Sequence, residues 1–313
     1  MLLKQHQIKL KNGKRTFTTL SNLTESDVYT NVNKWSRLII LLHGFPDINT
    51  TFNPIWSDLD KSFGEEQVLL LAPKLRGYEK SSQGPESEYK LTDIAEDVRV
   101  WIETLNPDGK YPVHLLGHDW GAIIAYQTAN LFPDLITSMV TLAIPYMADT
   151  NAWEFLWNCP EQFYLSSYFL TMQSSIIYLP KLIDKNCKYL GKLWRYWSPT
   201  YDFTNDEIQE IGNTFMEEGV ADAATSYYRH ILKPSTLLKS RWQVDFDKVP
   251  TLIMTGDEDG CMSLRLSQSE AAKLKGRTQV EFKILPNSGH FLQRESPEQV
   301  ARLATEFFEK YRG

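Results

Sequence analysis

The chain has 313 residues, of which 42% are hydrophobic and 23% are charged, so intrinsic disorder as its main state is excluded. Its 33 Lys and Arg residues against 39 Asp and Glu residues leave a net charge of −6, which argues against nucleic acid or an anionic membrane surface as the main partner. A chain of this length can bury a large core without metal or disulfide staples.

Short apolar runs alternate along the chain with longer amphipathic segments. An Asn12-Gly13 turn signal predicts a strand hairpin within residues 1–34. Helical spacing of apolar residues predicts helices over Leu91–Leu105 and Ala122–Leu131. Continuous apolar runs indicate strands buried on both faces, and they lie at Leu38–Leu42, Val68–Leu71, Val113–Leu116, Ile136–Ile144 and Thr251–Met254. This alternation predicts an α/β fold with a mostly parallel central sheet flanked by helices.

Residues 146–243 interrupt this alternation. Between Tyr146 and Tyr201, 14 of 56 residues are aromatic, or 25% against 12% in the whole chain, and strand-like runs are absent. We therefore predict a mostly helical lid at 146–243, inserted into a core made of residues 1–145 and 244–313. Aromatic packing within a small helical cap explains most of these side chains.

The three cysteines and the N-terminal residues bear on the cellular compartment. Cys159, Cys187 and Cys261 are odd in number, far apart and outside any CxxC pair, so we expect reduced and mostly buried thiols. Residues 1–6 lack the apolar core of a signal peptide, and no apolar run approaches the roughly 18 residues of a membrane span. The prediction is a cytoplasmic protein with no integral membrane segment.

A glycine-flanked aspartate follows the strand predicted at Val113–Leu116. The segment Gly117-His118-Asp119-Trp120-Gly121 opens the helix predicted from Ala122. A sharp strand-to-helix turn needs small residues, and its central side chain projects from the carboxyl edge of the sheet. The positive end of the helix favours the charged carboxylate, which needs no base to attack. Asp119 is the candidate nucleophile, able to form an ester that water then cleaves; a plain N-cap aspartate is the alternative.

The segment His43-Gly44-Phe45-Pro46-Asp47 follows the first buried run. A glycine turn at this point lets the chain bring a backbone N–H toward the elbow. We expect the N–H groups of Phe45 and Trp120 to form an oxyanion hole. An ordinary strand-ending turn is the alternative interpretation.

Carboxylates and a histidine follow the last two predicted strands. Thr251–Gly256 leads into Asp257, Glu258 and Asp259, and Val280–Leu285 leads toward His290. Groups at successive strand ends can meet above a sheet, where the acid would orient the imidazole that takes a proton from water. We predict Asp259 as the acid because it lies further from its strand than Asp257. A structural histidine is the alternative for His290.

Taken together, these segments resemble the epoxide hydrolase branch of the α/β-hydrolase superfamily. The resemblance covers most of residues 35–310 and rests on HGFPD at 43–47, RGY at 76–78, GHDWG at 117–121, GDEDG at 256–260 and SGH at 288–290. It implies an α/β-hydrolase fold with an inserted lid. It also implies an epoxide hydrolase that converts an epoxide and water to a vicinal diol through a covalent ester on Asp119.

The resemblance further implies two lid tyrosines that hold the epoxide oxygen. A phenol with a pKa of about 10 can protonate the alkoxide of the opened ring without ionising beforehand. In Tyr227-Tyr228-Arg229 the tyrosine before arginine is the donor, which selects Tyr228. The segment Tyr168–Gln173 selects Tyr168 as the first tyrosine, with Tyr164 as the other possibility.

The same features leave two other functions open. A haloalkane dehalogenase shares the Asp nucleophile, but it often places an Asn donor where this chain has Phe45, and it has no evident use for the Tyr-Tyr-Arg segment. A non-catalytic ligand-binding protein on the same fold is the third interpretation. The expected partner is a small apolar epoxide, such as a xenobiotic or lipid epoxide in detoxification. No metal or organic cofactor is expected, because the sequence has no phosphate-cradling glycine loop or metal-ligand cluster.

Overall fold

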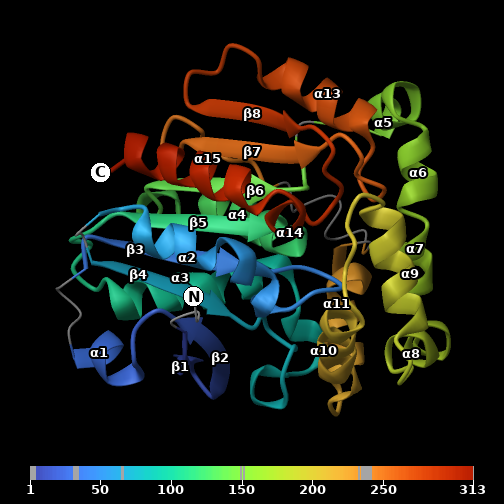
Figure 1. Cartoon of the computed structure of the whole chain (residues 1–313), viewed down its shortest axis with the longest axis horizontal. Helices are drawn as coiled ribbons and strands as arrows, with labels where there is room; N and C mark the ends of the chain where they lie inside the picture. The colour runs from blue at the N-terminus through green and yellow to red at the C-terminus, as the bar shows by residue number, and fades with distance from the viewer. Residues whose placement is uncertain are drawn as a thin grey trace.

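The apolar runs form one eight-stranded sheet in a computed structural model of the chain (Figure 1). The structure describes residues 5–30, 35–64, 67–148, 150, 152–231, 233 and 242–312. The strand order is β1-β2-β4-β3-β5-β6-β7-β8, and all neighbours from β4 to β8 in this order pair in parallel. The strands are β1 (His6–Asn12), β2 (Arg15–Ser21), β3 (Arg37–Leu42), β4 (Val68–Pro73), β5 (Val113–His118), β6 (Ser138–Leu142), β7 (Thr251–Gly256) and β8 (Val280–Leu285). The predicted mostly parallel sheet is confirmed.

One predicted strand is wrong in its bounds. The apolar run Ile136–Ile144 is longer than β6, which spans Ser138–Leu142. A short 3-10 turn, Pro133–Leu135, precedes the strand. At the other end Ala143 has a φ of 69°, in the left-handed region, so the extended backbone stops at Leu142.

The N-terminal hairpin forms as predicted. Strands β1 and β2 pair antiparallel, with Asn12 opposite Arg15, so two residues make the turn. Gly13 lies in that turn with a φ of 57°, a backbone conformation that costs glycine little. Because β2 also pairs antiparallel with β4, the hairpin extends one side of the parallel sheet.

Helices cover both faces of the sheet because each central strand is apolar on both sides. In β3, Leu38, Ile40 and Leu42 belong to a cluster that includes side chains of α3 and α4. Ile39 and Leu41 belong to a second cluster with side chains of α2 and α15. The helices outside the lid are α1 (Glu25–Thr30), α2 (Asn53–Lys61), α3 (Leu91–Leu105), α4 (Trp120–Leu131), α13 (Leu264–Leu274), α14 (Leu292–Glu295) and α15 (Pro297–Lys310), with 3-10 turns at Asn49–Phe52, Lys80–Ser82, Glu86–Glu88 and Pro133–Leu135.

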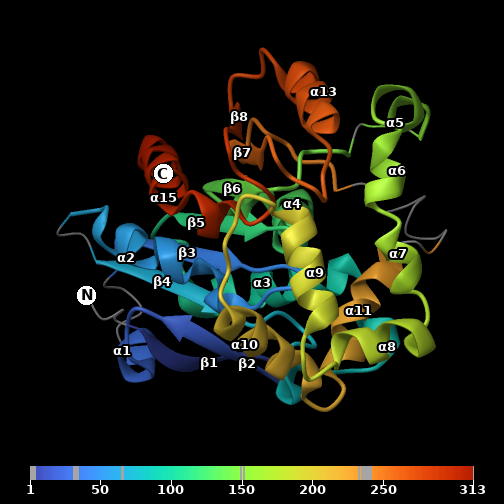
Figure 2. The same ribbon diagram turned by 45° about the vertical axis from the view of Figure 1, so that its right-hand side comes forward.

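The stretch between β6 and β7 is helical. Figures 1 and 2 both show its helices standing beyond the carboxyl ends of the parallel strands. They are α5 (Ala152–Asn158), α6 (Glu161–Leu165), α7 (Tyr168–Thr171), α8 (Ser175–Leu182), α9 (Lys188–Trp197), α10 (Asn205–Met216) and α11 (Val220–Ile231). We keep the name lid for residues 146–243, the boundaries that the sequence predicts.

Buried polar contacts fasten the lid to the core. The Trp194 indole N–H in α9 donates to the Pro46 carbonyl at 3.0 Å, and the Tyr227 hydroxyl in α11 donates to the Arg76 carbonyl at 2.8 Å. The Arg294 guanidinium, in α14, lies 2.9 Å from a carboxylate oxygen of Glu207 in α10 and 3.2 Å from one of Asp47. These contacts hold α9, α10 and α11 over the strand ends.

The cysteines agree with the prediction made for them. All three cysteines are free and buried. Within the described ranges of the chain, no helix has the length and apolar character needed to cross a membrane.

Candidate active site

Asp119 occupies the turn between β5 and α4. Its φ of 51° and ψ of −118° place it outside the regions that L-residues usually occupy, and only 3% of the residue is exposed. A Cβ at Gly117 would lie 2.3 Å from the Gly121 carbonyl oxygen, and one at Gly121 would lie 1.9 Å from the Leu42 carbonyl oxygen. The two glycines therefore permit the close backbone approach that the predicted elbow needs.

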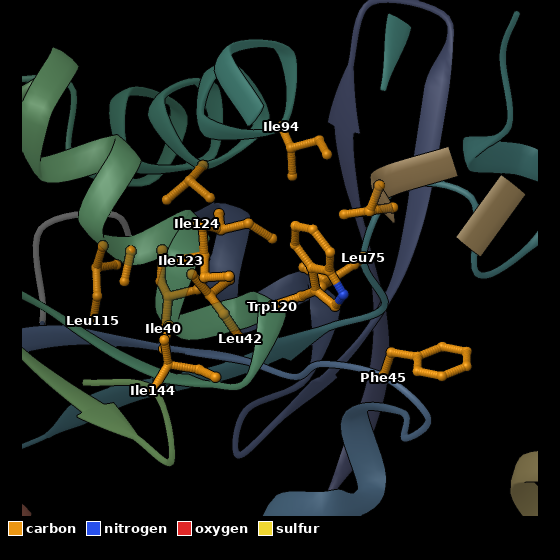
Figure 3. Packing of buried hydrophobic residues seen from close by; sticks show 14 of the residues in the cluster. Ile40, Leu42, Phe45, Leu75, Ile94, Leu115, Trp120, Ile123, Ile124 and Ile144 are labelled. Carbon is orange, nitrogen blue, oxygen red and sulfur yellow. The ribbon is translucent and has the colours of Figure 1, made fainter. Parts of the chain in front are cut away.

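The carboxylate of Asp119 meets one predicted backbone donor. The Phe45 N–H donates to Asp119 Oδ1 at 2.7 Å. Phe45 and Trp120 both belong to the buried cluster shown in Figure 3, which holds the two chain segments in place. Among the hydrogen bonds of the described residues there is none from the Trp120 N–H to this carboxylate, so the second oxyanion donor stays a prediction.

His290 lies between two carboxylates. Its Nδ1 is 2.9 Å from Asp259 Oδ2, and its Nε2 is 3.5 Å from Asp119 Oδ2. The other oxygen of Asp259 accepts the N–H groups of Cys261 at 2.7 Å and Met262 at 2.9 Å, which orient that carboxylate toward the ring. Asp257 is half-buried and Glu258 is exposed. The distances above show that the structure brings together Asp259, His290 and Asp119 from three separate strand ends.

The two carboxylates determine the charge of the imidazole. Burial by itself would lower the pKa of His290, but the charges of Asp259 and Asp119 outweigh burial and raise that pKa from 6.5 to about 10. Burial lowers the pKa of the adjacent His118 to about 3, so His118 is neutral, and its Nε2–H donates to the His290 carbonyl at 2.9 Å. Of these two histidines, only His290 is a cation at neutral pH.

This raised pKa predicts a pH dependence of stability. A folded-state pKa above the unfolded value stabilises the fold fully below pH 6.5, and that contribution is lost as the pH rises toward 10. We expect the free energy of unfolding of the wild type to fall more between pH 6.5 and 10 than that of His290→Gln. Urea denaturation across this range measures the difference; parallel curves for the two proteins would contradict the prediction.

The rings of the two predicted tyrosines are in edge-to-face contact, and Tyr168 lines a pocket together with Asp119. The Tyr228 side chain is fully buried, and its hydroxyl has no hydrogen-bond partner among the described residues. Tyr168 is half-buried, with its hydroxyl 3.7 Å from Cys261 Sγ and its ring centroid 5.7 Å from that of Tyr228. Burial raises the pKa of both phenols well above 10, and the charge of Asp119 contributes to both rises. Tyr164, the other possibility for the first tyrosine, is 72% exposed.

An apolar pocket of about 180 Å³ adjoins Asp119. Lid and core residues line it together: Trp120, Ile123, Ile144, Met147, Gln162, Ser166, Tyr168, Phe169, Ile231, Trp242, Cys261 and Met262. Mostly apolar walls around a few polar groups are typical of a site for a small organic molecule. In the described part of the chain, no group of His, Cys, Asp and Glu side chains is arranged to hold a metal ion.

Sequence reasoning missed Gln162 in this wall. Its side-chain Nε2–H donates to the Cys261 carbonyl at 2.9 Å, and its Oε1 accepts the Ser263 N–H at 2.8 Å. The amide thereby pins lid helix α6 to the loop that carries Asp259. The contact joins residues 99 positions apart, and no local sequence signal marks a glutamine for such a role.

Comparison with known proteins shows which protein family shares this architecture. A family model described as alpha/beta hydrolase fold matches residues 37–297. Epoxide hydrolase 4 of Mus musculus is 25% identical over 285 residues, which cover 87% of this chain and 73% of the relative. The AB hydrolase superfamily protein YfhM of Bacillus subtilis is 25% identical over 272 residues, covering 86% and 89% respectively.

A solved structure shows the same fold. Potato (Solanum tuberosum) epoxide hydrolase I superposes with a TM-score of 0.75 at 20% sequence identity, covering 98% of this chain and 100% of the potato chain. The family match spans most of the sheet and the lid. The chain belongs to the alpha/beta hydrolase fold family, and it is a hydrolase that is similar to curated epoxide hydrolases.

Proposed function

We propose that this protein is an epoxide hydrolase, which converts an epoxide and water to a vicinal diol through a covalent ester on Asp119. The observation that carries the proposal is the pair of neutral phenols: Tyr168 lines the same pocket as Asp119, and its ring centroid lies 5.7 Å from that of Tyr228. The relatives named epoxide hydrolases support it. The apolar pocket suits a small apolar epoxide, such as a xenobiotic or lipid epoxide. We retain detoxification and a cytoplasmic location as predictions.

Ring opening uses Asp119 and the two tyrosines. The phenols donate hydrogen bonds to the epoxide oxygen while Asp119 attacks one ring carbon from the opposite side. A carbon–oxygen bond forms to the carboxylate as the ring carbon–oxygen bond breaks, and a phenol proton passes to the leaving alkoxide. Tyr228 suits this role because its buried hydroxyl has no other partner among the described residues.

Ester hydrolysis uses His290 and Asp259. Once Asp119 is esterified it carries no charge, so one of the two charges that raise the pKa of His290 is gone. The imidazolium then gives up its proton more readily, and that proton returns to the tyrosine that was ionised during ring opening. The neutral imidazole can now accept a proton from water. The resulting hydroxide attacks the carbonyl carbon of Asp119, and the Phe45 N–H, with that of Trp120, stabilises the oxyanion by roughly 3 kcal/mol per donor. The tetrahedral carbon then expels the alkoxide of the diol, which takes up the proton of the new carboxylic acid, so that the diol leaves and the Asp119 carboxylate is restored.

The assay that tests this function compares two leaving groups. We expect a vicinal diol from styrene oxide and no bromide from a bromoalkane. Bromide release without diol would favour the haloalkane dehalogenase alternative. Binding of both compounds without turnover would favour the ligand-binding alternative, and either result contradicts the proposed function.

Replacing Tyr228 with Phe tests the ring-opening step. We expect Tyr228→Phe to slow alkylation of Asp119 by roughly 10²-fold or more, because the alkoxide loses a proton donor, and to change ester hydrolysis much less. Pre-steady-state kinetics separate the two steps. Tyr227→Phe is the matched control, since that hydroxyl is committed to the Arg76 carbonyl. Equal slowing of both steps by Tyr228→Phe would assign Tyr228 a structural role.

A further inference from the structure

The loop that carries His290 is held by a carboxylate outside the site described above. Glu295 Oε2 accepts the Gly289 N–H at 2.8 Å, and its Oε1 accepts the Phe291 N–H at 3.0 Å. These two residues flank His290 on either side. One carboxylate therefore fixes the Ser288–Gly289 peptide plane and the His290–Phe291 peptide plane, without contacting the ring.

The lid completes the hydrogen-bonding capacity of that carboxylate. The Ser198 hydroxyl donates to Glu295 Oε1 at 2.6 Å, and the Thr200 hydroxyl donates to Oε2 at 2.5 Å. Both hydroxyls lie just after α9, in the middle of the lid. Each carboxylate oxygen of Glu295 thus accepts one bond from the His290 loop and one bond from the lid.

The lid segment 196–200, which we call the corner, also contacts His290 and the loop that carries Asp259. The His290 N–H points at both the Trp197 carbonyl, at 3.0 Å, and Ser198 Oγ, at 2.8 Å. The Gly260 N–H, next to Asp259, donates to that same Trp197 carbonyl at 3.0 Å. The corner at residues 196–200 therefore lies between the loops of the predicted acid and the predicted base.

Close packing fixes the position of this corner relative to the loops of Asp259 and His290. A Cβ at Gly289 would lie 2.6 Å from Ser198 Cα, and one at Gly260 would lie 1.9 Å from the Tyr196 carbonyl oxygen. Both loops thus pack directly onto the lid backbone. A shift of the corner would move Ser198 and Thr200 away from Glu295.

We propose that Glu295 is a positioning residue for His290. We also propose that, through Ser198 and Thr200, the orientation of the imidazole depends on the packing of the lid against the core. The inference rests on the proposed function, because His290 acts there as the base. Glu295 touches neither the substrate nor the reacting atoms. It acts through the backbone of residues 289 and 291, so its loss disturbs ester hydrolysis, which needs a well-aimed imidazole, and spares ring opening by Asp119.

The first test replaces Glu295 with Gln, which has the same shape but offers one acceptor oxygen instead of two. We expect ester hydrolysis to slow roughly 10- to 100-fold, since a small misplacement of a reacting group has effects of that order, while alkylation changes less than about twofold. Acid quenching and mass spectrometry of Asp119 would reveal accumulated ester. Glu298→Gln, an exposed glutamate in α15, is the matched control. Unchanged hydrolysis, or equal slowing of both steps, would overturn the proposal.

A second pair of variants tests the contribution of the Thr200 hydroxyl. It also keeps the proposal testable if Glu295→Gln fails to fold. Thr200→Val removes the hydroxyl that reaches Glu295 and keeps the shape of the side chain, whereas Thr200→Ser keeps the hydroxyl. We expect slower ester hydrolysis in Thr200→Val and wild-type hydrolysis in Thr200→Ser. Equal rates in the two variants would overturn the dependence on the lid.

A readout without substrate separates this inference from the proposed function. The ring nitrogen signals of His290 in nuclear magnetic resonance report its environment whether or not an epoxide is turned over. We expect Glu295→Gln and Thr200→Val to shift these signals and their titration, and Glu298→Gln and Thr200→Ser to leave them unchanged. Unshifted signals in Glu295→Gln would overturn the inference even if the wild type hydrolyses epoxides; shifted signals support it even if no epoxide is found.

Discussion

The His290→Gln variant is expected to stop after one chemical step and accumulate an ester on Asp119. Glutamine cannot take a proton from water, so the second half-reaction should slow roughly 10²- to 10⁴-fold, the range that general-base catalysis contributes. Ring opening needs only the carboxylate of Asp119 and the phenols of Tyr168 and Tyr228, so alkylation should continue. The ester is measured by acid quenching followed by mass spectrometry of the peptide that contains residue 119.

The control for this variant is His118→Gln. His118 is equally buried and adjacent to Asp119, but it is neutral and its Nε2–H is committed to the His290 carbonyl. We expect it to turn over without lasting accumulation of ester. Turnover of His290→Gln at the wild-type rate would show that His290 is not the base.

Replacement of Asp119 with Asn has the larger expected effect on the complete reaction. An amide oxygen is a far weaker nucleophile than a carboxylate, so turnover should fall by at least roughly 10⁴-fold, in line with the removal of other enzymatic nucleophiles. The amide oxygen can still accept the Phe45 N–H, so the fold should persist. Steady-state diol formation from styrene oxide measures the loss, with Asp257→Asn as the matched control.

The same variant tests the electrostatic account of the site. Asp119 is one of the two carboxylates that raise the pKa of His290. Removing its charge should lower that pKa, which a titration followed by nuclear magnetic resonance would detect. A pKa of His290 that stays near 10 in Asp119→Asn would contradict the proposed link between esterification and release of the imidazole proton.

Local signals in the sequence predicted much of the fold. The helix over Leu91–Leu105 has the predicted bounds, because its apolar spacing follows the helical period throughout. The strand expected at Ile136–Ile144 is too long, because apolar residues continue past the backbone turn at Ala143. Hydrophobicity reports burial, whereas the end of a strand depends on backbone angles that the apolar pattern does not encode.

The candidate site also has residues that local sequence signals predict and residues that they do not. The elbow around Asp119 was predictable because its glycines are required by contacts within a few residues and with the neighbouring strand. The pairing of Asp259 with His290 followed from the position of both at strand ends. The bonds of Gln162 and Glu295 join lid and core across about 100 residues of sequence, and they depend on how the lid packs, which local patterns do not determine.

Oxygen tracing in a single turnover tests the covalent ester most directly. Enzyme in excess over styrene oxide would react in heavy-oxygen water. Mass spectrometry would then measure the masses of the peptide that contains Asp119 and of the diol. If hydroxide attacks the carbonyl carbon of the ester, the heavy oxygen enters the Asp119 carboxylate, and the first diol carries an ordinary oxygen taken from that side chain. A labelled diol with an unlabelled Asp119 would mean that water attacks the epoxide itself, and would contradict the nucleophilic role of Asp119.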